Sequence, residues 1–311
     1  MAFSDASSSL WNAISPPAPK LERLQQDMQV DCVIVGAGFT GMNAAWHLMK
    51  KGLQVCVLEA HEPGWGASGR NGGMAVLRYK HGWSSLARQF GDETTRLLYG
   101  LILQAVDGLE ANVQELGIDG GFRRYGHITA AHKSADFRNL KNDIDWLRSV
   151  ANDSAPQLLS PAEAAEMIGS TTYVGGYLDR RAGGINPLGY AREFAAALSK
   201  RGLPLFVSTP VIRVEKGPQG YRVHTEGGCV TAERLIVATN AYSAMQPLPG
   251  KLAQRVVPVT SSVIATQAIP EEIYSKILPG NELVTDTRHL VNYFRRVPGN
   301  RVLFGGRGSM N

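Results

Sequence analysis

The sequence predicts an α/β protein, α+β overall, in which one part is built on a parallel sheet and the other on a mainly antiparallel sheet. An apolar segment of strand type at 30–35 is followed by a glycine-rich turn, a helical segment at 42–51 and a second apolar run at 54–58. This order is typical of a βαβ unit. Residues 203–240 then alternate short apolar strands, and residues 255–311 are rich in Val, Ile, Thr, Phe and Tyr, which favours an antiparallel sheet.

The turn of the βαβ unit has the spacing of a dinucleotide-binding motif. Its glycines are Gly36, Gly38 and Gly41, and Glu59 follows 18 residues after Gly41, at the end of the second apolar run. In such a motif the first glycine permits the tight turn, the second lets a pyrophosphate approach the backbone, and the third lets the helix pack closely on the strand. The free N–H groups at the start of the helix and the positive end of its dipole favour binding of the phosphates. We expect Glu59 to accept hydrogen bonds from ribose hydroxyls.

A second glycine-rich loop follows the βαβ unit. Residues 64–73 read Gly-Trp-Gly-Ala-Ser-Gly-Arg-Asn-Gly-Gly, with five glycines in ten positions. Ordering such a loop costs entropy, which makes sense where backbone amides must lie against a flat or anionic ligand. Ser68 offers a hydroxyl, Arg70 a fixed positive charge, and Asn71 a side chain that tolerates left-handed turns. The alternative is a surface loop without a ligand.

The remaining chain shows further helices and strands. We expect a helix over 84–116, a helix capped by Ser134 that runs to about Val150, and a strand over 122–131. Ser160-Pro161-Ala162-Glu163 has the pattern of a capping box, and Asn186-Pro187 opens a helix that ends near Lys200.

Composition excludes several classes of protein. Of the 311 residues, 44% are hydrophobic and 19% charged, and the net charge is +5, values of an ordinary globular protein. Basic residues form only short pairs, so nucleic acid is a poor partner, and no apolar run has the length of a membrane span. The scattered histidines and cysteines predict no metal site. The isolated Cys32, Cys56 and Cys229 are typical of buried thiols in a reducing compartment, so we expect a cytoplasmic protein.

Several segments together resemble one protein family. Residues 66–73 resemble the flavin-contacting loop of the glycine/D-amino-acid oxidase (DAO-type) family of FAD-dependent oxidoreductases, and residues 184–188 resemble the step into its internal helix. Residues 235–242 resemble the strand that closes the FAD domain, and residues 301–307 a late strand of the substrate sheet. With its N-terminal Leu10-Trp11 arm, the chain is most similar to the bacterial branch containing gamma-glutamylputrescine oxidoreductase, although Met74 stands where that branch often carries Gln.

The resemblance implies a Rossmann-like FAD-binding domain with a mainly antiparallel β substrate domain. We expect an N-terminal arm at 1–27, a discontinuous FAD-binding domain at 28–82 and 160–243, and a substrate domain at 83–159 and 244–311. Family members continue beyond the strand at 301–307 into a segment that completes the flavin site. We therefore expect this chain to be C-terminally truncated.

The resemblance also implies the chemistry. The expected activity is oxidation of the C–N bond of a small amine or amino acid (a D-amino acid, a glycine- or sarcosine-like or a gamma-glutamylputrescine-like molecule) by hydride transfer to FAD. FAD is expected to be non-covalent, because residues 64–73 contain no His, and the electron acceptor is O₂ or a carrier. The alternatives are a non-catalytic remnant of the family and, less favoured, an NAD(P)-linked dehydrogenase.

The candidate residues fall into two groups. A substrate carboxylate would need an arginine on the substrate sheet, for which we choose Arg295, with Tyr293 beside it and Arg307 as the second choice. The expected cofactor contacts are Gly36, Gly38, Phe39, Thr40, Gly41, Glu59, Ala60, Ser68, Arg70, Asn71, Gly72, Gly73, Val211 and Thr239.

Overall fold

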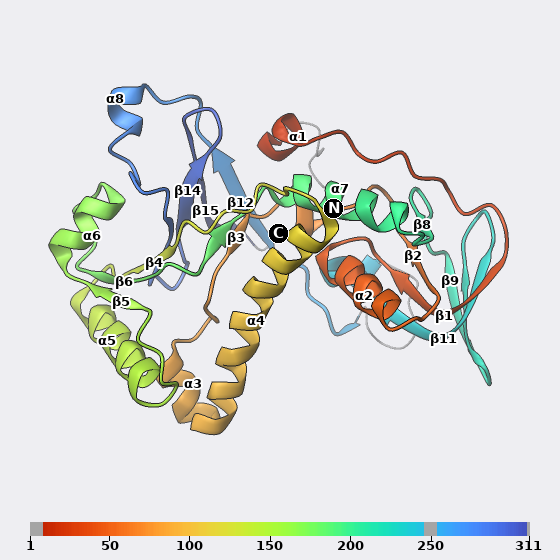
Figure 1. Ribbon diagram of the computed structural model, residues 1–311, viewed down its shortest axis with the longest axis horizontal. Helices are drawn as coiled ribbons and strands as arrows, with labels where there is room; N and C mark the ends of the chain where they lie inside the picture. Colours follow the sequence, from red (N-terminus) through yellow and green to blue (C-terminus); the bar gives the residue numbers. More distant parts are fainter. Residues whose placement is uncertain (1–8, 246–253, 310–311) are drawn as a thin grey trace. The chain divides into compact units, whose positions relative to one another are not determined.

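The computed structural model describes residues 9–245 and 254–309, without the side chains of residues 244, 245 and 307–309. Two compact units, each made of helices and sheets, confirm the predicted α/β class (Figure 1). Unit 1 takes in Met1–Asn71, Leu116–Gly120 and Asn186–Thr260, and unit 2 takes in Gly72–Glu115, Gly121–Ile185 and Ser261–Asn311. In the described ranges no helix combines the length and the apolar character needed to cross a membrane.

Unit 1 is built on a six-stranded sheet. Its strands, in sheet order, are β8 (Leu205–Phe206), β2 (Val55–Leu58), β1 (Met28–Val35), β11 (Cys229–Val237), β10 (Gly220–His224) and β9 (Arg213–Gly217). The first four run parallel, and β11, β10 and β9 are antiparallel neighbours. Cys32 and Cys56 lie on adjacent strands as buried free thiols, as the sequence predicts. The end of β1 is buried throughout, which explains its continuous apolar sequence.

The helices of unit 1 begin close to the start signals in the sequence. α2 (Phe39–Lys50) begins three residues before the expected helical segment at 42–51, because Gly38 is already its N-cap. α7 (Pro187–Lys200) is capped by Asn186, whose side chain accepts a hydrogen bond from the Gly189 N–H, and Pro187 occupies the first position. This confirms the predicted helix. Two 3₁₀ turns, η2 (Ala67–Gly69) and η3 (Asn240–Met245), complete the unit.

Residues 9–27, the described part of the expected N-terminal arm at 1–27, belong to unit 1. They contain the short helix α1 (Leu10–Ile14), whose Trp11 is only 4% exposed and donates its indole N–H to the Asn71 carbonyl at 2.8 Å. Arg192 of α7 donates to the Pro16 carbonyl and to the Asn12 side chain, each at 2.8 Å. The segment is therefore attached to the loop at 64–73 and to α7.

Unit 2 is built on a seven-stranded sheet. Its strands, in sheet order, are β12 (Thr260–Ala265), β15 (Arg301–Ser309), β14 (Tyr293–Val297), β13 (Leu283–Asp286), β4 (His127–Ala130), β6 (Gly176–Asp179) and β5 (Gln157–Leu159). β13 and β4 are parallel, whereas β15-β14, β14-β13, β4-β6 and β6-β5 are antiparallel. This confirms the predicted, mainly antiparallel sheet. A separate two-stranded ladder joins β3 (Met74–Ala75) to β7 (Gly183–Gly184).

The two faces of this sheet differ in polarity. One face carries the apolar side chains of Ile128, Leu178 and Val284, which form a buried cluster with Ile168 at the end of helix α6 (Pro161–Ile168). On the other face the register aligns four polar or aromatic residues in one row across the strands, because each is the Cα partner of the next: Tyr293, Thr285, Thr129 and Tyr177. Residues that pair directly across strands share a face, so this row marks the polar face of the sheet.

The helices of unit 2 partly differ from the prediction. The single helix expected over 84–116 is two helices, α3 (Trp83–Phe90) and α4 (Asp92–Leu116), because Gly91 adopts a φ of 82° that ends the first one. α5 (Ser134–Ser149) has Lys133, not Ser134, at its N-cap. α6 (Pro161–Ile168) starts with the predicted capping box of Ser160 and Glu163. A short α8 (Glu271–Tyr274) precedes β13.

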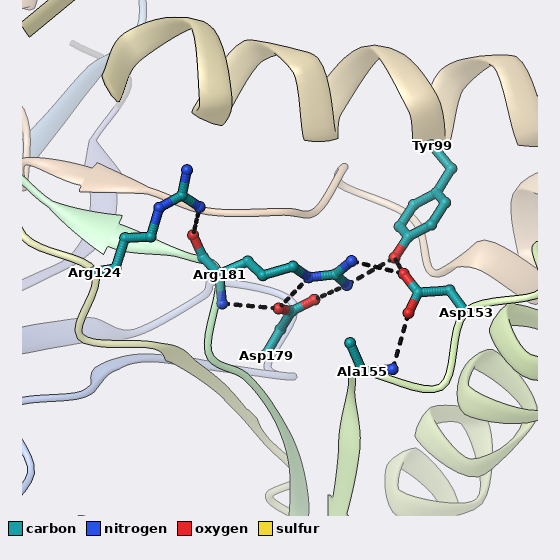
Figure 2. A network of polar contacts seen from close by, with 6 residues as sticks. All are labelled: Tyr99, Arg124, Asp153, Ala155, Asp179 and Arg181. Carbon is teal, nitrogen blue, oxygen red and sulfur yellow. Dashed lines mark hydrogen bonds and ion pairs between the residues drawn. The ribbon is translucent and has the colours of Figure 1, made fainter. Parts of the chain in front are cut away.

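A partly buried ion-pair network ties α4 to β6 in unit 2 (Figure 2). The Arg181 guanidinium donates to Asp179 at 2.6 Å and to Asp153 at 2.7 Å, and also to the hydroxyl oxygen of Tyr99 at 2.9 Å. Tyr99 in turn donates its O–H to Asp153 at 2.5 Å. Three segments far apart in the sequence are thus held by one cation.

The observed units do not follow the expected domain limits. Residues 160–185 were expected in the FAD-binding domain, but β6 pairs with β4 and β5, and β7 pairs with β3, which places this segment in unit 2. Likewise, the step from unit 1 to unit 2 falls after Asn71 instead of after residue 82. Strand pairing between distant segments decides both limits.

Candidate cofactor pocket and substrate sheet

A pocket of about 390 Å³ lies in unit 1 at the carboxyl ends of the parallel strands. In open α/β sheets this edge is where ligands bind. Its apolar walls include Val35, Leu58 and Ala238, and its polar groups include Glu59 and Ser68. Of the expected cofactor contacts, those that line the pocket are Gly36, Gly38, Glu59, Ala60, Ser68, Val211 and Thr239.

The first and third glycines of the turn leave no room for a side chain. Gly36 has a φ of 108°, and a Cβ there would lie 2.7 Å from the Ala238 carbonyl oxygen. A Cβ on Gly41 would lie 1.9 Å from the Gly36 carbonyl oxygen. The glycines therefore permit the sharp turn and the close packing of α2 on β1.

The second glycine faces the 64–73 loop. A Cβ on Gly38 would lie 2.9 Å from the Ser68 hydroxyl oxygen, which itself accepts a hydrogen bond from the Phe39 N–H at 3.0 Å. Ser68 thus satisfies one of the free N–H groups at the start of α2. The two glycine-rich segments are in direct contact beside the pocket.

Backbone contacts of Arg70 and Asn71 shape the 64–73 loop. The Arg70 guanidinium donates to the Trp65 carbonyl at 2.7 Å and lies over the Trp65 ring. The Asn71 side chain donates to the carbonyls of Ser68 at 2.8 Å and Ala67 at 3.1 Å. These two residues hold the loop in shape and are not among the pocket-lining residues.

Glu59 presents its carboxylate at the pocket. One oxygen accepts from the Ala37 N–H at 2.7 Å and the other from the His61 N–H at 2.9 Å. Burial raises the pKa of Glu59, while these backbone donors oppose that shift. Each carboxylate oxygen has further lone pairs, so the group can also accept hydrogen bonds from two neighbouring hydroxyls of a ligand.

The other expected contacts lie outside this pocket. Phe39 packs edge-on against Tyr190, with ring centroids 5.5 Å apart, and Thr40 is exposed on the first turn of α2. Gly72 and Gly73 belong to unit 2, where Gly73 has a φ of 65° and its carbonyl accepts from the Ile185 N–H at 2.8 Å.

The pocket also contains aromatic residues that the sequence analysis did not select. His61 stacks on Trp65 with centroids 3.9 Å apart, and Tyr242 lies 5.7 Å from Trp65. All three line the pocket. The sequence could have indicated Trp65 as a pocket residue, because it lies inside the glycine-rich loop. Nothing local in the sequence connects Tyr242 with this loop.

The donor set fits the adenosine diphosphate half of FAD. Gly36 and Gly38 leave the turn without side chains, the start of α2 offers N–H groups to phosphates, and Glu59 offers acceptors to ribose hydroxyls. In the described ranges no group of three or more His, Cys, Asp or Glu residues is placed to hold a metal ion.

In unit 2, Arg295 and Tyr293 lie two residues apart on β14. Arg295 is 6% exposed, and its guanidinium donates to the carbonyls of Gly73 and, at 3.0 Å, Ile185. Burial lowers the pKa of Arg295 to about 10. The Tyr293 ring covers Gly305, where a Cβ would lie 2.0 Å from the ring. The side chain of Arg307, the second choice, lies outside the described residues.

Comparison with known proteins gives consistent matches. Residues 31–310 match the model of a protein family, DAO, described as FAD dependent oxidoreductase. Gamma-glutamylputrescine oxidoreductase of Escherichia coli (strain K12) is 30% identical over 304 residues, which cover 98% of this chain and 70% of that protein. Glycine oxidase of Geobacillus kaustophilus (strain HTA426) is 28% identical over 229 residues, 69% of this chain and 55% of that protein. The crystal structure of glycine oxidase from Geobacillus kaustophilus shares the fold, with a TM-score of 0.73 at 23% identity over 90% of this chain and 72% of that one.

Proposed function

The chain belongs to the DAO family of FAD-dependent oxidoreductases, which act on amines or amino acids, and on that premise we propose that it oxidises the C–N bond of a gamma-glutamylputrescine-like amine. The observation that carries this proposal is the pocket of unit 1, where the glycine turn and Glu59 lie together in a chain whose residues 31–310 match the family. The family also favours FAD over the NAD(P)-linked alternative.

A bound flavin supplies the acceptor for a hydride from the carbon next to the amine nitrogen. The substrate would lose two electrons as a hydride in this reaction, and water would release the oxidised carbon as a carbonyl compound with an amine or ammonia. O₂ or a carrier would be the final acceptor of the two electrons. The protein's own task is to hold the cofactor, to orient the amine and to exclude water from the reacting carbon.

The cofactor is held by residues of unit 1 in this proposal. Glu59 accepts from the ribose hydroxyls and the N–H groups at the start of α2 face the pyrophosphate, while Val211 and Thr239 contribute to the walls of the pocket. FAD is bound non-covalently: residues 64–73 contain neither His nor Cys, and Cys32, Cys56 and Cys229 are buried. Acid precipitation of the FAD-loaded protein should release all flavin into the supernatant; flavin that stays in the pellet would contradict this.

The substrate is positioned by residues of unit 2. Tyr293 presents its ring on the polar face of the sheet, and Arg295 fixes the carbonyls of Gly73 and Ile185, the first of which ends the 64–73 loop. Arg295 would then act through the backbone. Pairing of Arg295 with a substrate carboxylate stays a prediction, tested below.

The direct test is anaerobic mixing of the FAD-loaded protein with candidate amines. We expect the visible absorption of oxidised flavin to bleach with the γ-glutamyl amide of 1,4-diaminobutane and, less readily, with glycine, sarcosine or D-amino acids. O₂ is then admitted. If the absorption returns and H₂O₂ forms, O₂ is the electron acceptor; if the flavin stays reduced, the acceptor is a carrier. A protein that binds FAD but is bleached by none of these compounds would refute the proposed function.

A further inference from the structure

Unit 2 contains a second pocket, of about 410 Å³, on the polar face of its sheet. Thr129 and Tyr177 of the row described above form its floor, while α3 and α5 contribute Arg88 and Asp143. The cofactor pocket and this pocket share no residue. None of the motifs that predict FAD binding accounts for it.

The pocket contains cations without carboxylate partners. Arg78 donates to the Thr285 hydroxyl and Lys80 to the His289 carbonyl at 3.3 Å, whereas Arg88 makes no hydrogen bond among the described residues. None of these three forms an ion pair within the described part of the chain. The acids Asp286 and Asp136 are engaged with Arg288 and Asn292, and with His132 and Thr287, respectively.

Asp143 is the exception among the acids. It is 5% exposed, and both of its hydrogen bonds, from the N–H and the hydroxyl of Ser84, use Oδ1. Oδ2 makes no hydrogen bond with any described residue. Burial raises the pKa of Asp143, and the nearby charges of Arg88 and Arg78 oppose that shift. A buried carboxylate with one unused oxygen is a strong acceptor for a ligand ammonium group.

The register fixes how far Thr129, which lines this pocket, lies from Tyr293. Thr129 is two strands from Tyr293 in the same row, and adjacent strands are about 4.8 Å apart, so the backbones of these two residues are about 10 Å apart. That is the length of about three extended residues. Glycine or sarcosine is too short to reach both places, whereas an amine joined to an amino acid through an amide is long enough.

We propose that this pocket binds the α-amino-acid head group of an elongated amine substrate, with its carboxylate at Arg88 and its ammonium group at Asp143. The proposal rests on the proposed function, because it places the amine that is oxidised at Tyr293. The guanidinium of Arg295 donates to backbone carbonyls, which favours the pocket as the place of the substrate carboxylate.

Calorimetry on the full 311-residue chain with non-oxidisable analogues tests this pocket. γ-Glutamyl-n-butylamide carries the complete head group, glutaric acid mono-n-butylamide lacks the ammonium group, and 4-aminobutanoyl-n-butylamide lacks the carboxylate. We expect the complete analogue to bind about tenfold or more tightly than either of the others. Equal affinities for all three, or no binding of the complete analogue, would overturn the proposal.

Variants assign the two charges. Arg88→Gln should weaken the two carboxylate-bearing analogues about tenfold and leave the third unchanged. Asp143→Asn, which keeps an acceptor for Ser84, should weaken only the two ammonium-bearing analogues. Arg148→Gln, an exposed change on α5 away from the pocket, is the matched control and should change none. Uniform weakening by Arg88→Gln, at an unchanged melting temperature, would contradict the assignment.

Flavin reduction separates this inference from the proposed function. If 1,4-diaminobutane and its γ-glutamyl amide reduce the flavin with equal KM, the function holds and the pocket proposal fails. If the calorimetry discriminates as expected but no amine reduces the flavin, the proposed function fails, and with it the placement of the amine at Tyr293.

Discussion

Replacing Gly38 by Ala separates the space needed by a ligand from the space needed by the protein. Gly38 has a φ of −81°, so alanine introduces no backbone strain at this N-cap. Its Cβ would lie 2.9 Å from the Ser68 oxygen, where ordinary contact begins at 3.4 Å, so Ser68 must move by about 0.5 Å. The hydrogen bond from Phe39 to Ser68 is then weakened, at a cost of about 1 kcal/mol, and the melting temperature should fall by about 2–4 °C.

The effect on FAD should be larger than the effect on stability. Overpacking a close contact costs about 1–3 kcal/mol, which corresponds to roughly 5- to 150-fold in affinity. FAD titration followed by flavin fluorescence measures the loss of FAD affinity, and thermal melting of the apoprotein measures the loss of stability. Ser68→Ala removes the clash partner and serves as the background. If Gly38→Ala on that background binds FAD as tightly as Ser68→Ala alone, Gly38 serves Ser68 and not a pyrophosphate, and the reasoning is refuted.

Three further predictions concern single side chains. Glu59→Gln should lower FAD affinity by about 1.5–3 kcal/mol for each lost charged hydrogen bond, and unchanged affinity in the same titration would place the ribose contact elsewhere. Arg295→Ala should lower the melting temperature, because the buried carbonyls of Gly73 and Ile185 lose a charged donor, although the Gly73 carbonyl keeps the Ile185 N–H. If Arg295 pairs with a substrate carboxylate, the activation free energy derived from kcat/KM should also rise by several kcal/mol more for carboxylated amines than for plain amines, and equal losses would remove that pairing. Burial tends to raise the pKa of Asp153, but hydrogen bonds from Tyr99, Ala155 and Arg181 outweigh it and lower the pKa. The stabilisation by Asp153 is therefore present above its unfolded pKa of about 3.9 and lost as the pH falls through the lower folded value, so the difference in melting temperature between wild type and Asp153→Asn should stay constant from pH 7 to about pH 5 and shrink as the pH falls below about 4; a constant difference throughout would contradict the shift.

Local spacing predicts the βαβ unit because its constraints are local. The apolar run before Gly36, the helix after Gly41 and the distance to Glu59 all lie within one short stretch of chain, and the structure has β1, α2 and β2 there. Helix starts that depend on capping side chains were also predictable. Ser160 and Asn186 each cap the helix that the sequence indicates.

Apolar periodicity alone does not show where a helix is interrupted. The apolar spacing continues across Gly91, and only its left-handed backbone separates α3 from α4. A glycine in a helical pattern is compatible with both a continuous helix and a break, so the sequence left this undecided.

The pockets depend on contacts between distant segments. Tyr242 reaches Trp65 because β11 pairs with β1, and Asp143 reaches Ser84 because α5 packs against α3. The unit limits near residue 185 likewise follow from the pairing of β7 with β3. Such pairings need a three-dimensional structure, because hydrophobic pattern fixes which face is buried but not which strand is the neighbour.

Anaerobic flavin reduction tests the central claim most directly. The protein is loaded with FAD, freed of excess cofactor and mixed with the γ-glutamyl amide of 1,4-diaminobutane, and the visible flavin spectrum is followed. Our account predicts bound flavin that bleaches on addition of the amine, and Gly38→Ala should remove most of the bound flavin beforehand. Bound flavin that stays oxidised with every amine and amino acid, or tight binding of NAD⁺ in place of FAD, would contradict the account.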